Sequence, residues 1–449
     1  MGQQIIVIND YKVAVDLLEK RSSVYSSRPA SPLFKLSGWD WAIPFMPYGQ
    51  WWRRHRRAFW QYFHPEAIHV HYPRQEESAR KLLSRLLKTP EDFAHHVEYT
   101  LNAAVMGTCY GSPVASQSDA YISVFKAAES TLDLVAPGAN VLVGFFPALA
   151  RLPTWIPGAS SLRRLAQSRK ITTAMRDTPW LDLKAAIAAE DSEATDRSVG
   201  GTILRRLSSS PHGFPLEDDE IIGKHVAAIV YFGGLGTTHS QVLAFLLAMS
   251  LHPDVQVKAQ EELDCFLGQA RLPVLGDMES LPYVSAIVKE TLRWHTTGPL
   301  GVPHATVADD EYNGYFIPKH SVVIPNTWAF LHDPAVYPEP DAFIPERFLK
   351  GGRFGTTLQP DPVMAFGFGR RICPGRHYAF ATLFIYMASI LCTFNIAPPV
   401  DEDGKPTRIH PRQTTGMVSF QEDCRCILTP RSASAEDLIK REETDAVSN

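Results

Sequence analysis

The residues with the clearest chemical potential lie around Cys373, in the run Phe366-Gly367-Phe368-Gly369-Arg370-Arg371-Ile372-Cys373-Pro374-Gly375. A predicted helix, His377–Phe394, follows this run, so the sulfur should lie near a helix N-terminus, where exposed N–H groups favour the thiolate. A thiolate is a metal ligand. The glycines let the backbone pass close to a flat cofactor, and Pro374 fixes the direction of the chain. The alternative is a small buried cysteine beside an ordinary glycine turn.

The pattern F-x-x-G-x-R-x-C-x-G resembles the haem-binding loop of the cytochrome P450 family, in which a cysteine thiolate is the axial ligand of the haem iron. Other segments resemble the same family, in the same order, along almost the whole chain. The resemblance implies a mainly α fold with a small β portion, built as one large domain around haem b over residues 1–430. It implies that Cys373 ligates the iron and that Phe366 and Gly375 contact the haem.

A second anchor of the resemblance is the segment Glu290-Thr291-Leu292-Arg293. Residues three apart share a helix face, so Glu290 and Arg293 can pair, although such spacing is common on solvated surfaces. Arg347, in Pro345-Glu346-Arg347-Phe348, is similar to the family arginine that joins this pair and braces the haem loop. The resemblance implies a buried network that is structural rather than catalytic.

A basic run near the N-terminus, Trp51-Trp52-Arg53-Arg54-His55-Arg56-Arg57, contains residues suited to binding a carboxylate. Trp52 and Arg56 lie four apart on one helix face and offer an indole N–H and a guanidinium fork. They match the family pattern W-x-x-x-R, which holds a haem propionate, and Arg371 and His304 resemble the remaining propionate partners. Four such donors can neutralise two buried carboxylates.

The other basic residues of this run should point elsewhere. A basic run is usually a solvated face. In this family such a face can dock an acidic reductase, and the candidates are Arg53, Arg54 and Arg57.

The oxygen-handling segment is predicted in a long helix, Glu220–Leu251, whose middle reads Gly233-Gly234-Leu235-Gly236-Thr237-Thr238. Each glycine in a helix interior costs about 1 kcal/mol relative to alanine, so something other than helix stability explains these three. The segment resembles the family pattern A/G-G-x-D/E-T-T, where the helix bulges open over the haem. Thr237 matches the threonine that handles O2 and the waters that deliver protons, and Thr238 follows it.

One position of this segment departs from the family pattern. The acid that normally precedes the threonine is replaced by Gly236. Proton delivery should therefore use water in the vacated space or another group, for which His239, one turn along, is a candidate.

The amino-acid composition narrows the classes of partner that this chain can bind. Lys and Arg total 44 against 48 for Asp and Glu, a net charge of −4 that argues against nucleic acid as a partner. No uninterrupted apolar segment reaches the length of a transmembrane helix. The chain opens on a predicted strand, Ile5–Ile8, and a helix, Tyr11–Glu19, so compared with eukaryotic family members we expect it to lack the N-terminal anchor and first elements. The family nevertheless predicts the cytoplasmic face of the endoplasmic reticulum membrane.

Two further segments have distinct compositions. Val135–Gly158 is apolar and broken by prolines, so it cannot form a long helix, and a buried loop is the simplest interpretation. The resemblance instead makes it a roof of the substrate pocket that touches the membrane surface through exposed Phe145, Phe146 and Trp155. The tail, residues 431–449, is charged and lacks aromatics, which favours disorder.

The resemblance implies a monomeric haem-thiolate monooxygenase that inserts one atom of O2 into a C–H bond of a small apolar molecule, most like fungal members of secondary metabolism. The chain has no dinucleotide motif, so electrons should come from NADPH through a separate cytochrome P450 reductase. Two alternatives remain: a haem-thiolate isomerase or peroxygenase, which needs no proton relay, and an inactive truncated product. The residues expected around the substrate are Trp39, Trp41, Phe45, Leu235, Pro299, Leu300 and Met417.

Overall fold

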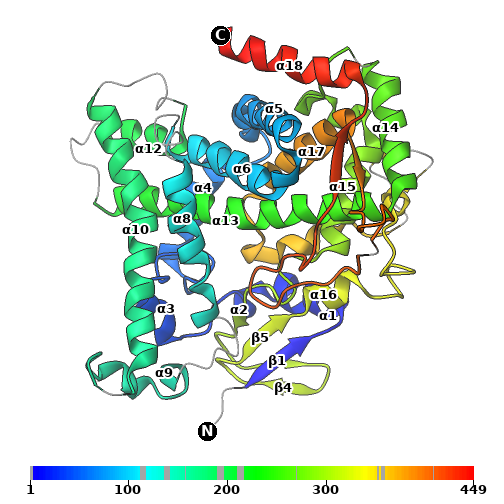
Figure 1. Cartoon of the computed structure of the whole chain (residues 1–449). Coiled ribbons are helices and arrows are strands. Elements are labelled where there is room, and N and C mark those ends of the chain that lie inside the picture. Colours follow the sequence, from blue (N-terminus) through cyan, green and yellow to red (C-terminus); the bar gives the residue numbers. More distant parts are fainter. Residues whose placement is uncertain are drawn as a thin grey trace.

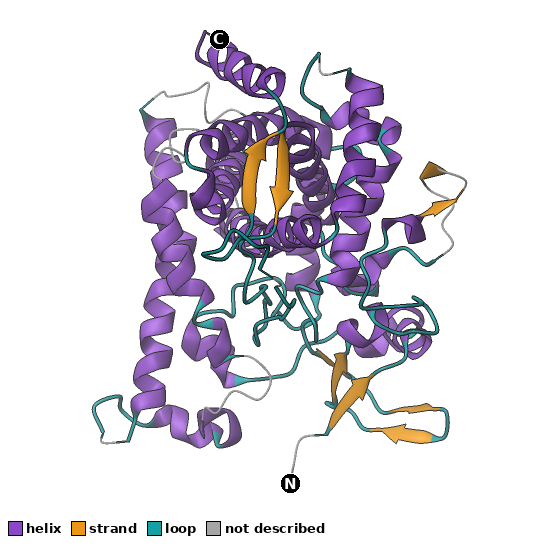
Figure 2. Ribbon diagram, turned by 45° about the vertical axis from the view of Figure 1, so that its right-hand side comes forward, coloured by secondary structure: helices purple, strands orange, loops and turns teal. Residues whose placement is uncertain are grey.

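The computed structural model of the chain describes residues 4–111, 118–135, 142–156, 158–189, 197–209, 217–268, 270–350, 353–354, 359–407 and 409–448. Helices dominate these residues, and the strands are short and few, which confirms the mainly α fold with a small β portion (Figure 2). The helices are α1 (Tyr11–Val15), α2 (Ser22–Tyr25), α3 (Pro32–Ser37), α4 (Gln50–Phe63), α5 (Tyr72–Lys88), α6 (Phe93–Tyr110), α8 (Ser118–Glu129), α9 (Leu142–Phe145), α10 (Ser160–Ala188), α12 (Val199–Ser208), α13 (Glu217–Leu251), α14 (Pro253–Leu267), α15 (Pro282–Trp294), α16 (Thr327–Leu331), α17 (Arg376–Thr393) and α18 (Ala433–Ser448).

Helix α13 is the longest helix in the described part of the chain and runs through the middle of the molecule (Figure 1). Its first turn carries Asp218, Asp219 and Glu220, whose negative charges suit the positive end of the helix dipole. Most of its later positions are buried, as expected for a helix that is apolar on all sides. The helix predicted over Glu220–Leu251 is therefore present and begins at Glu217.

Two further helices complete the centre of the core. Helix α13 packs against α6 and α17, and α5 covers both of these. Helix α17 begins directly after the Cys373 loop and is buried along nearly its whole second half. Its bounds differ by one residue at each end from the predicted helix His377–Phe394. The loop that carries Cys373 is therefore anchored at its C-terminal end by a rigid, buried element.

The main sheet lies at the end of the molecule that holds the N-terminus (Figure 1). Its order is β1-β5-β2: β1 is parallel to β5 with Ile5 opposite Val322, and β2 is antiparallel to β5 with His304 opposite Val323. The predicted strand Ile5–Ile8 is present as an edge strand, whereas the predicted helix Tyr11–Glu19 is split into α1 and a π-helical turn, Asp16–Lys20. The strands are β1 (Ile5–Ile8), β2 (His304–Ala305), β3 (Asp310–Tyr312), β4 (Tyr315–Ile317), β5 (Val322–Pro325), β6 (Leu349–Lys350), β7 (Arg353–Phe354), β8 (Phe394–Ala397) and β9 (Ile427–Pro430).

The proline-broken segment contains only short helices among its described residues, α9 and the 3-10 helix Pro147–Arg151. Phe146 is 62% exposed and Trp155 is 79% exposed, so these aromatic rings face solvent as the resemblance implied. Residues 136–141 and 157, and the side chain of Phe145, lie outside what the structure describes. None of the described helices combines the length and the apolar character needed to cross a bilayer.

The C-terminal segment differs from the disordered tail expected from its composition. It forms α18, which packs against α5 (Figure 1). Leu438 and Ile439 are buried, and Glu442 pairs with Arg80 of α5 at 3.1 Å. The few apolar residues of the tail lie at helical spacing, so they bury one narrow face although the overall composition is polar.

Candidate functional site

The Cys373 loop is folded back on itself before α17 begins. The Cys373 N–H donates to the Phe366 carbonyl at 2.7 Å, which closes the turn. Gly367 and Gly369 have φ of 86° and 50°, a region that favours glycine. A β-carbon at Gly369 would collide with the carbonyl oxygen of Leu18, so this glycine is also required by a close approach of two backbones.

The environment of the Cys373 sulfur only partly agrees with the expectation of a stabilised thiolate. Burial raises the pKa of the thiol, although the N–H of Gly375 and the cations Arg56 and Arg376 act in the opposite direction. Desolvation therefore outweighs the helix N-terminus, which corrects the prediction made from the sequence. A metal cation bound to the sulfur would displace the proton, because ligating cysteines are deprotonated.

The predicted propionate partners come together near this loop. The guanidinium carbon of Arg371 lies 4.4 Å from the centre of the Trp52 ring, and Trp52 is buried. Arg371 donates to the carbonyl oxygens of Ser26 at 2.7 Å and Met46 at 2.8 Å. Burial, and after it the nearby charge of Arg56, lowers the pKa of Arg371 to about 9. Burial also lowers the pKa of Arg56 to about 10.

His304 and a residue that the sequence did not suggest, Arg28, extend this cluster. Nδ1 of His304 lies 2.7 Å from the Tyr25 carbonyl oxygen. Burial and then Arg28 hold the pKa of His304 well below its usual range, so the ring is neutral in this setting. Arg28 is buried and donates to the carbonyl oxygens of Val302 at 2.8 Å and Pro303 at 2.9 Å. No motif surrounds Arg28, so no local signal could have identified it.

The charge balance of this cluster tests whether the site fits haem. Arg28, Arg56 and Arg371 form no ion pair with an acidic side chain of the described residues. Burial also holds the pKa of Arg28 well below its usual range. Arg28 is buried and Arg56 and Arg371 are half-buried. Cations withdrawn from water without acidic partners are unfavourable, so the cluster calls for an anionic ligand. The two propionates of haem supply that charge, and the residues present therefore fit the cofactor.

The environment of Arg54 does not match the exposed docking role expected for this residue. Its guanidinium pairs with Asp218 at 2.7 Å and Asp219 at 3.0 Å, at the start of α13. These pairs neutralise Arg54 and tie α4 to α13, so it is not available to a partner protein. Arg53 and Arg57 are exposed.

The glycine-rich segment of α13 remains helical. The Thr237 hydroxyl donates to the Gly233 carbonyl at 2.7 Å, within the helix. A β-carbon built at Gly233 would meet no atom within 4 Å, so open space adjoins the helix at this position. Thr238 is buried. The Thr237 hydroxyl therefore lies one helical turn after Gly233, where open space adjoins the backbone of α13.

The space beside Gly236 is filled by a carboxylate rather than left for water. A β-carbon at Gly236 would collide with Oε1 of Glu129, at the end of α8. His239 instead places Nε2 at 3.2 Å from the Ala94 carbonyl, and burial lowers its pKa to about 4. The sequence predicted water or another group beside Gly236, with His239 as a candidate; the group that lies there is Glu129, which the sequence did not suggest.

The Glu290 network lies in the buried interior. Arg293 donates to both carboxylate oxygens of Glu290, at 2.7 Å and 2.8 Å, and both side chains are fully buried. Nε of Arg347 lies 3.3 Å from Glu290. Arg293 also donates to the carbonyls of Leu331, Pro340 and Ala342, so the network links α15 to the segment that follows α16.

The residues expected around the substrate differ in burial. Trp39, Trp41 and Phe45 are buried in one aromatic cluster, and Trp39 lies 4.6 Å from Phe232 of α13 between ring centres. Leu300, by contrast, is 43% exposed.

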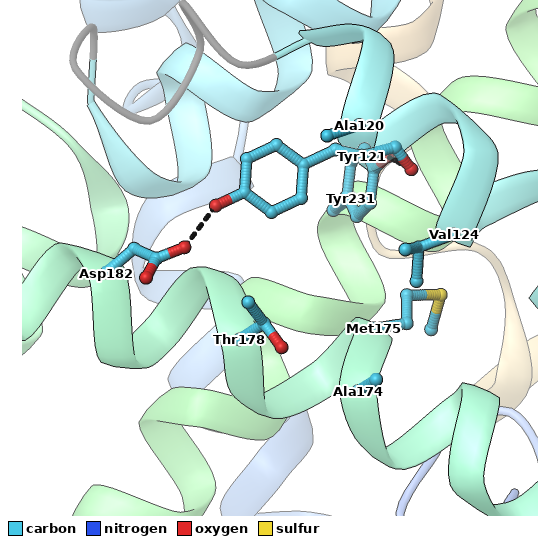
Figure 3. Close-up of a pocket in the computed structure, with 8 residues that line it drawn as sticks. All are labelled: Ala120, Tyr121, Val124, Ala174, Met175, Thr178, Asp182 and Tyr231. Atoms are coloured by element: carbon cyan, nitrogen blue, oxygen red, sulfur yellow. Dashed lines mark hydrogen bonds between the residues drawn. The ribbon is translucent and has the colours of Figure 1, made fainter.

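A separate cavity of about 140 Å³ lies between α8, α10 and α13 (Figure 3). The Tyr121 hydroxyl donates to the Asp182 carboxylate at its edge. None of the residues predicted around haem or substrate lines it. The cavity is lined by Ala120, Tyr121, Val124, Ala174, Met175, Thr178, Asp182 and Tyr231.

Comparison with known proteins agrees with this geometry. The family model described as Cytochrome P450 matches residues 1–421. The cytochrome P450 monooxygenase COX2 of Coprinopsis cinerea is 37% identical over 446 residues, which cover 98% of this chain and 83% of the relative. Cytochrome P450 monooxygenase claR of Ampulloclitocybe clavipes is 38% identical over 98% of this chain and 80% of its own length. Cytochrome P450 monooxygenase ppsD of Aspergillus oryzae is 37% identical over 98% of this chain and 82% of its own length.

Proposed function

The chain belongs to the cytochrome P450 family, and from this premise we propose that it is a haem-thiolate monooxygenase acting on a small, apolar organic molecule. It would insert one atom of O2 into a C–H bond and release the other as water. One observation carries the proposal: Cys373 is presented at the start of α17 near buried and half-buried cations that have no acidic partner among the described residues. This combination suits a thiolate-ligated cofactor that carries two carboxylates.

The residues around the cofactor would have distinct tasks. Haem b, when bound, supplies the redox chemistry that activates O2. Cys373 would ligate its iron, and Phe366 and Gly375 would contact the ring. The propionates would be held by Trp52, Arg28, Arg56, Arg371 and His304, the last gaining a proton as the anion binds.

The oxygen side would be formed by α13. Thr237 would orient the water beside the O2 site, because its hydroxyl oxygen can accept a hydrogen bond from water while its hydrogen is directed at Gly233. The buried Thr238 would support this turn. Glu290, Arg293 and Arg347 would brace the Cys373 loop from a distance without touching reactants.

Partners and location follow from the same family. Electrons would come from NADPH through a separate cytochrome P450 reductase, for which the exposed Arg53 and Arg57 are docking candidates. Phe146 and Trp155 would touch the cytoplasmic face of the endoplasmic reticulum membrane. The protein would act as a monomer in fungal secondary metabolism. The isomerase or peroxygenase alternative depended on a missing acid, and the Glu129 carboxylate beside Gly236 removes that argument.

Turnover under isotopically labelled O2 tests the proposed function. The haem-loaded chain should be combined with NADPH, a fungal reductase and a panel of apolar substrates. We expect a product that has gained one labelled oxygen atom, measured by mass spectrometry. A product of unchanged mass, or one whose oxygen comes from water, would contradict monooxygenation.

The propionate assignment predicts different effects of two substitutions on the same helix. Arg56→Ala should weaken haem binding about ten- to a hundredfold, because a charge-assisted hydrogen bond contributes roughly 1.5–3 kcal/mol. Arg53→Ala is the matched control because Arg53 is exposed. It should keep haem and lower only the reductase-driven rate, most strongly at low salt. Haem content per chain is the measurement, and equal content in both variants would refute the assignment.

A further inference from the structure

The family acid that is missing from α13 has a counterpart on another helix. We propose that Glu129 of α8 supplies the carboxylate that α13 lacks at Gly236 and relays protons from solvent toward Thr237. The proposal rests on the proposed monooxygenase function, because isomerisation would consume no protons. It makes Glu129 a proton-relay residue that acts through water and Thr237.

The geometry that carries this inference is a close approach between α8 and α13. A β-carbon at Gly236 would collide with Oε1 of Glu129 and lie 3.5 Å from its Cδ. Phe125, one turn earlier on α8, contacts the rings of Tyr231 and Phe232 on α13, with ring centres 5.8 Å and 5.4 Å apart. The end of α8 is therefore fixed against α13, and a side chain at position 236 would displace the carboxylate from its present place.

The electrostatic surroundings leave Glu129 without a fixed partner. Its carboxylate makes no hydrogen bond or ion pair with the described residues, whereas the neighbouring Glu98 of α6 pairs with Lys126 at 2.7 Å. Burial and then Glu98 raise the pKa of Glu129 to about 7, and Lys126 opposes the shift. A carboxyl group that titrates near neutral pH can both accept and release a proton during turnover.

A pocket connects Glu129 to solvent. Its volume is about 480 Å³, and the Lys126 side chain in its lining is 57% exposed, so water can reach it. Thr237, the next residue of α13 after Gly236, donates its hydroxyl hydrogen to the Gly233 carbonyl, so its hydroxyl oxygen can accept a hydrogen bond from water. The pocket is lined by Ala94, His95, Glu98, Lys126, Glu129, His239 and Phe420.

The chemistry of the reaction requires such a route. Monooxygenation combines O2, a C–H bond, two electrons and two protons to give a hydroxylated product and water. The electrons come from NADPH through the reductase, and the protons must come from solvent. Glu129 would take a proton from pocket water, pass it toward Thr237 through water, and return to its starting state.

Moving the carboxylate tests the proposal. Glu129→Gln should lower product formed per NADPH by about a hundredfold and raise peroxide release, because general acid–base groups contribute roughly 10²–10⁴-fold. Gly236→Ala should have the same direction of effect, because the added methyl displaces the carboxylate. The double variant Glu129→Ala with Gly236→Asp returns an acid to α13 and should recover coupling. Glu261→Gln, at an exposed carboxylate of α14, is the control.

Two readouts separate this proposal from the proposed function. Peroxide-supported product formation bypasses the relay and should be unchanged in Glu129→Gln. Infrared spectroscopy of the resting protein should detect a carboxyl group titrating near pH 7 in the wild type and not in Glu129→Gln. The groups facing Glu129 that also titrate or carry charge are His95 and Glu98 on α6, Lys126 on α8 and His239 on α13.

The outcomes are distinct. Wild-type coupling should fall above about pH 7 as Glu129 loses its proton, and Glu129→Gln should lack this step. Product from wild type with unchanged coupling in Glu129→Gln would overturn the relay and leave the monooxygenase intact. No carboxyl titration near neutral pH would also overturn it. Absence of product by both NADPH and peroxide routes would overturn the proposed function, and the relay with it.

Discussion

A Cys373→Ser chain should lose at least about a thousandfold in product formed from NADPH and O2, equivalent to about 4 kcal/mol of barrier. Serine keeps the size of the side chain but removes the thiolate that would ligate the haem iron and supply it with electron density for O2 activation. The measurement is product per haem, with haem content determined on the same sample.

The control for this substitution is Cys265→Ser, because Cys265 is an exposed free cysteine on α14. It should behave as the wild type. The propionate cluster is untouched in Cys373→Ser, so haem should still bind, and lost activity then reports on the ligand. Wild-type turnover in Cys373→Ser would show that another residue ligates the iron.

Arg293→Ala should destabilise the fold by about 3–5 kcal/mol, because it leaves the buried Glu290 carboxylate without its main partner. Arg347 remains within 3.3 Å but cannot replace both hydrogen bonds. The substitution also removes donors from three backbone carbonyls. Urea denaturation at equal haem content measures the loss.

An exposed pair provides the comparison for this prediction. Lys440 and Glu436 pair at 2.7 Å on α18, and Lys440→Ala should change stability by at most about 1 kcal/mol. The contrast isolates the effect of burial on an ion pair. A loss below about 1 kcal/mol in Arg293→Ala would mean that the Glu290 network carries little of the stability.

Features set by short-range patterns could be predicted from the sequence. The Cys373 loop is a contiguous run, and Glu290 and Arg293 share a helix face because they lie three apart. Helix α13 was predicted with nearly its observed bounds, since its apolar run and acidic first turn are both local. The mainly α fold followed from such elements together.

Features that depend on contacts between segments far apart in the sequence could not be predicted from the sequence. Arg28 has no motif around it and becomes a site residue only because the fold buries it beside Arg371. Arg54 looked free until α13 brought Asp218 and Asp219 to it. Glu129 lies beside Gly236 only because the fold packs the end of α8 against α13.

The balance between opposing energetic contributions also could not be predicted from the sequence. The direction of the Cys373 pKa depends on how strongly burial opposes the helix N-terminus, and a sequence does not give burial. Helix α18 was missed because composition averages over the few apolar residues that form its buried face. Both errors arose where a local rule competed with tertiary packing.

The ferrous carbon monoxide spectrum of the wild-type chain tests most directly that Cys373 makes this protein a haem-thiolate enzyme. We predict the strongly red-shifted Soret band that a thiolate ligand produces, in proportion to bound haem. A Soret band at the position typical of histidine-ligated haem, in a freshly prepared and fully haem-loaded sample, would contradict the account.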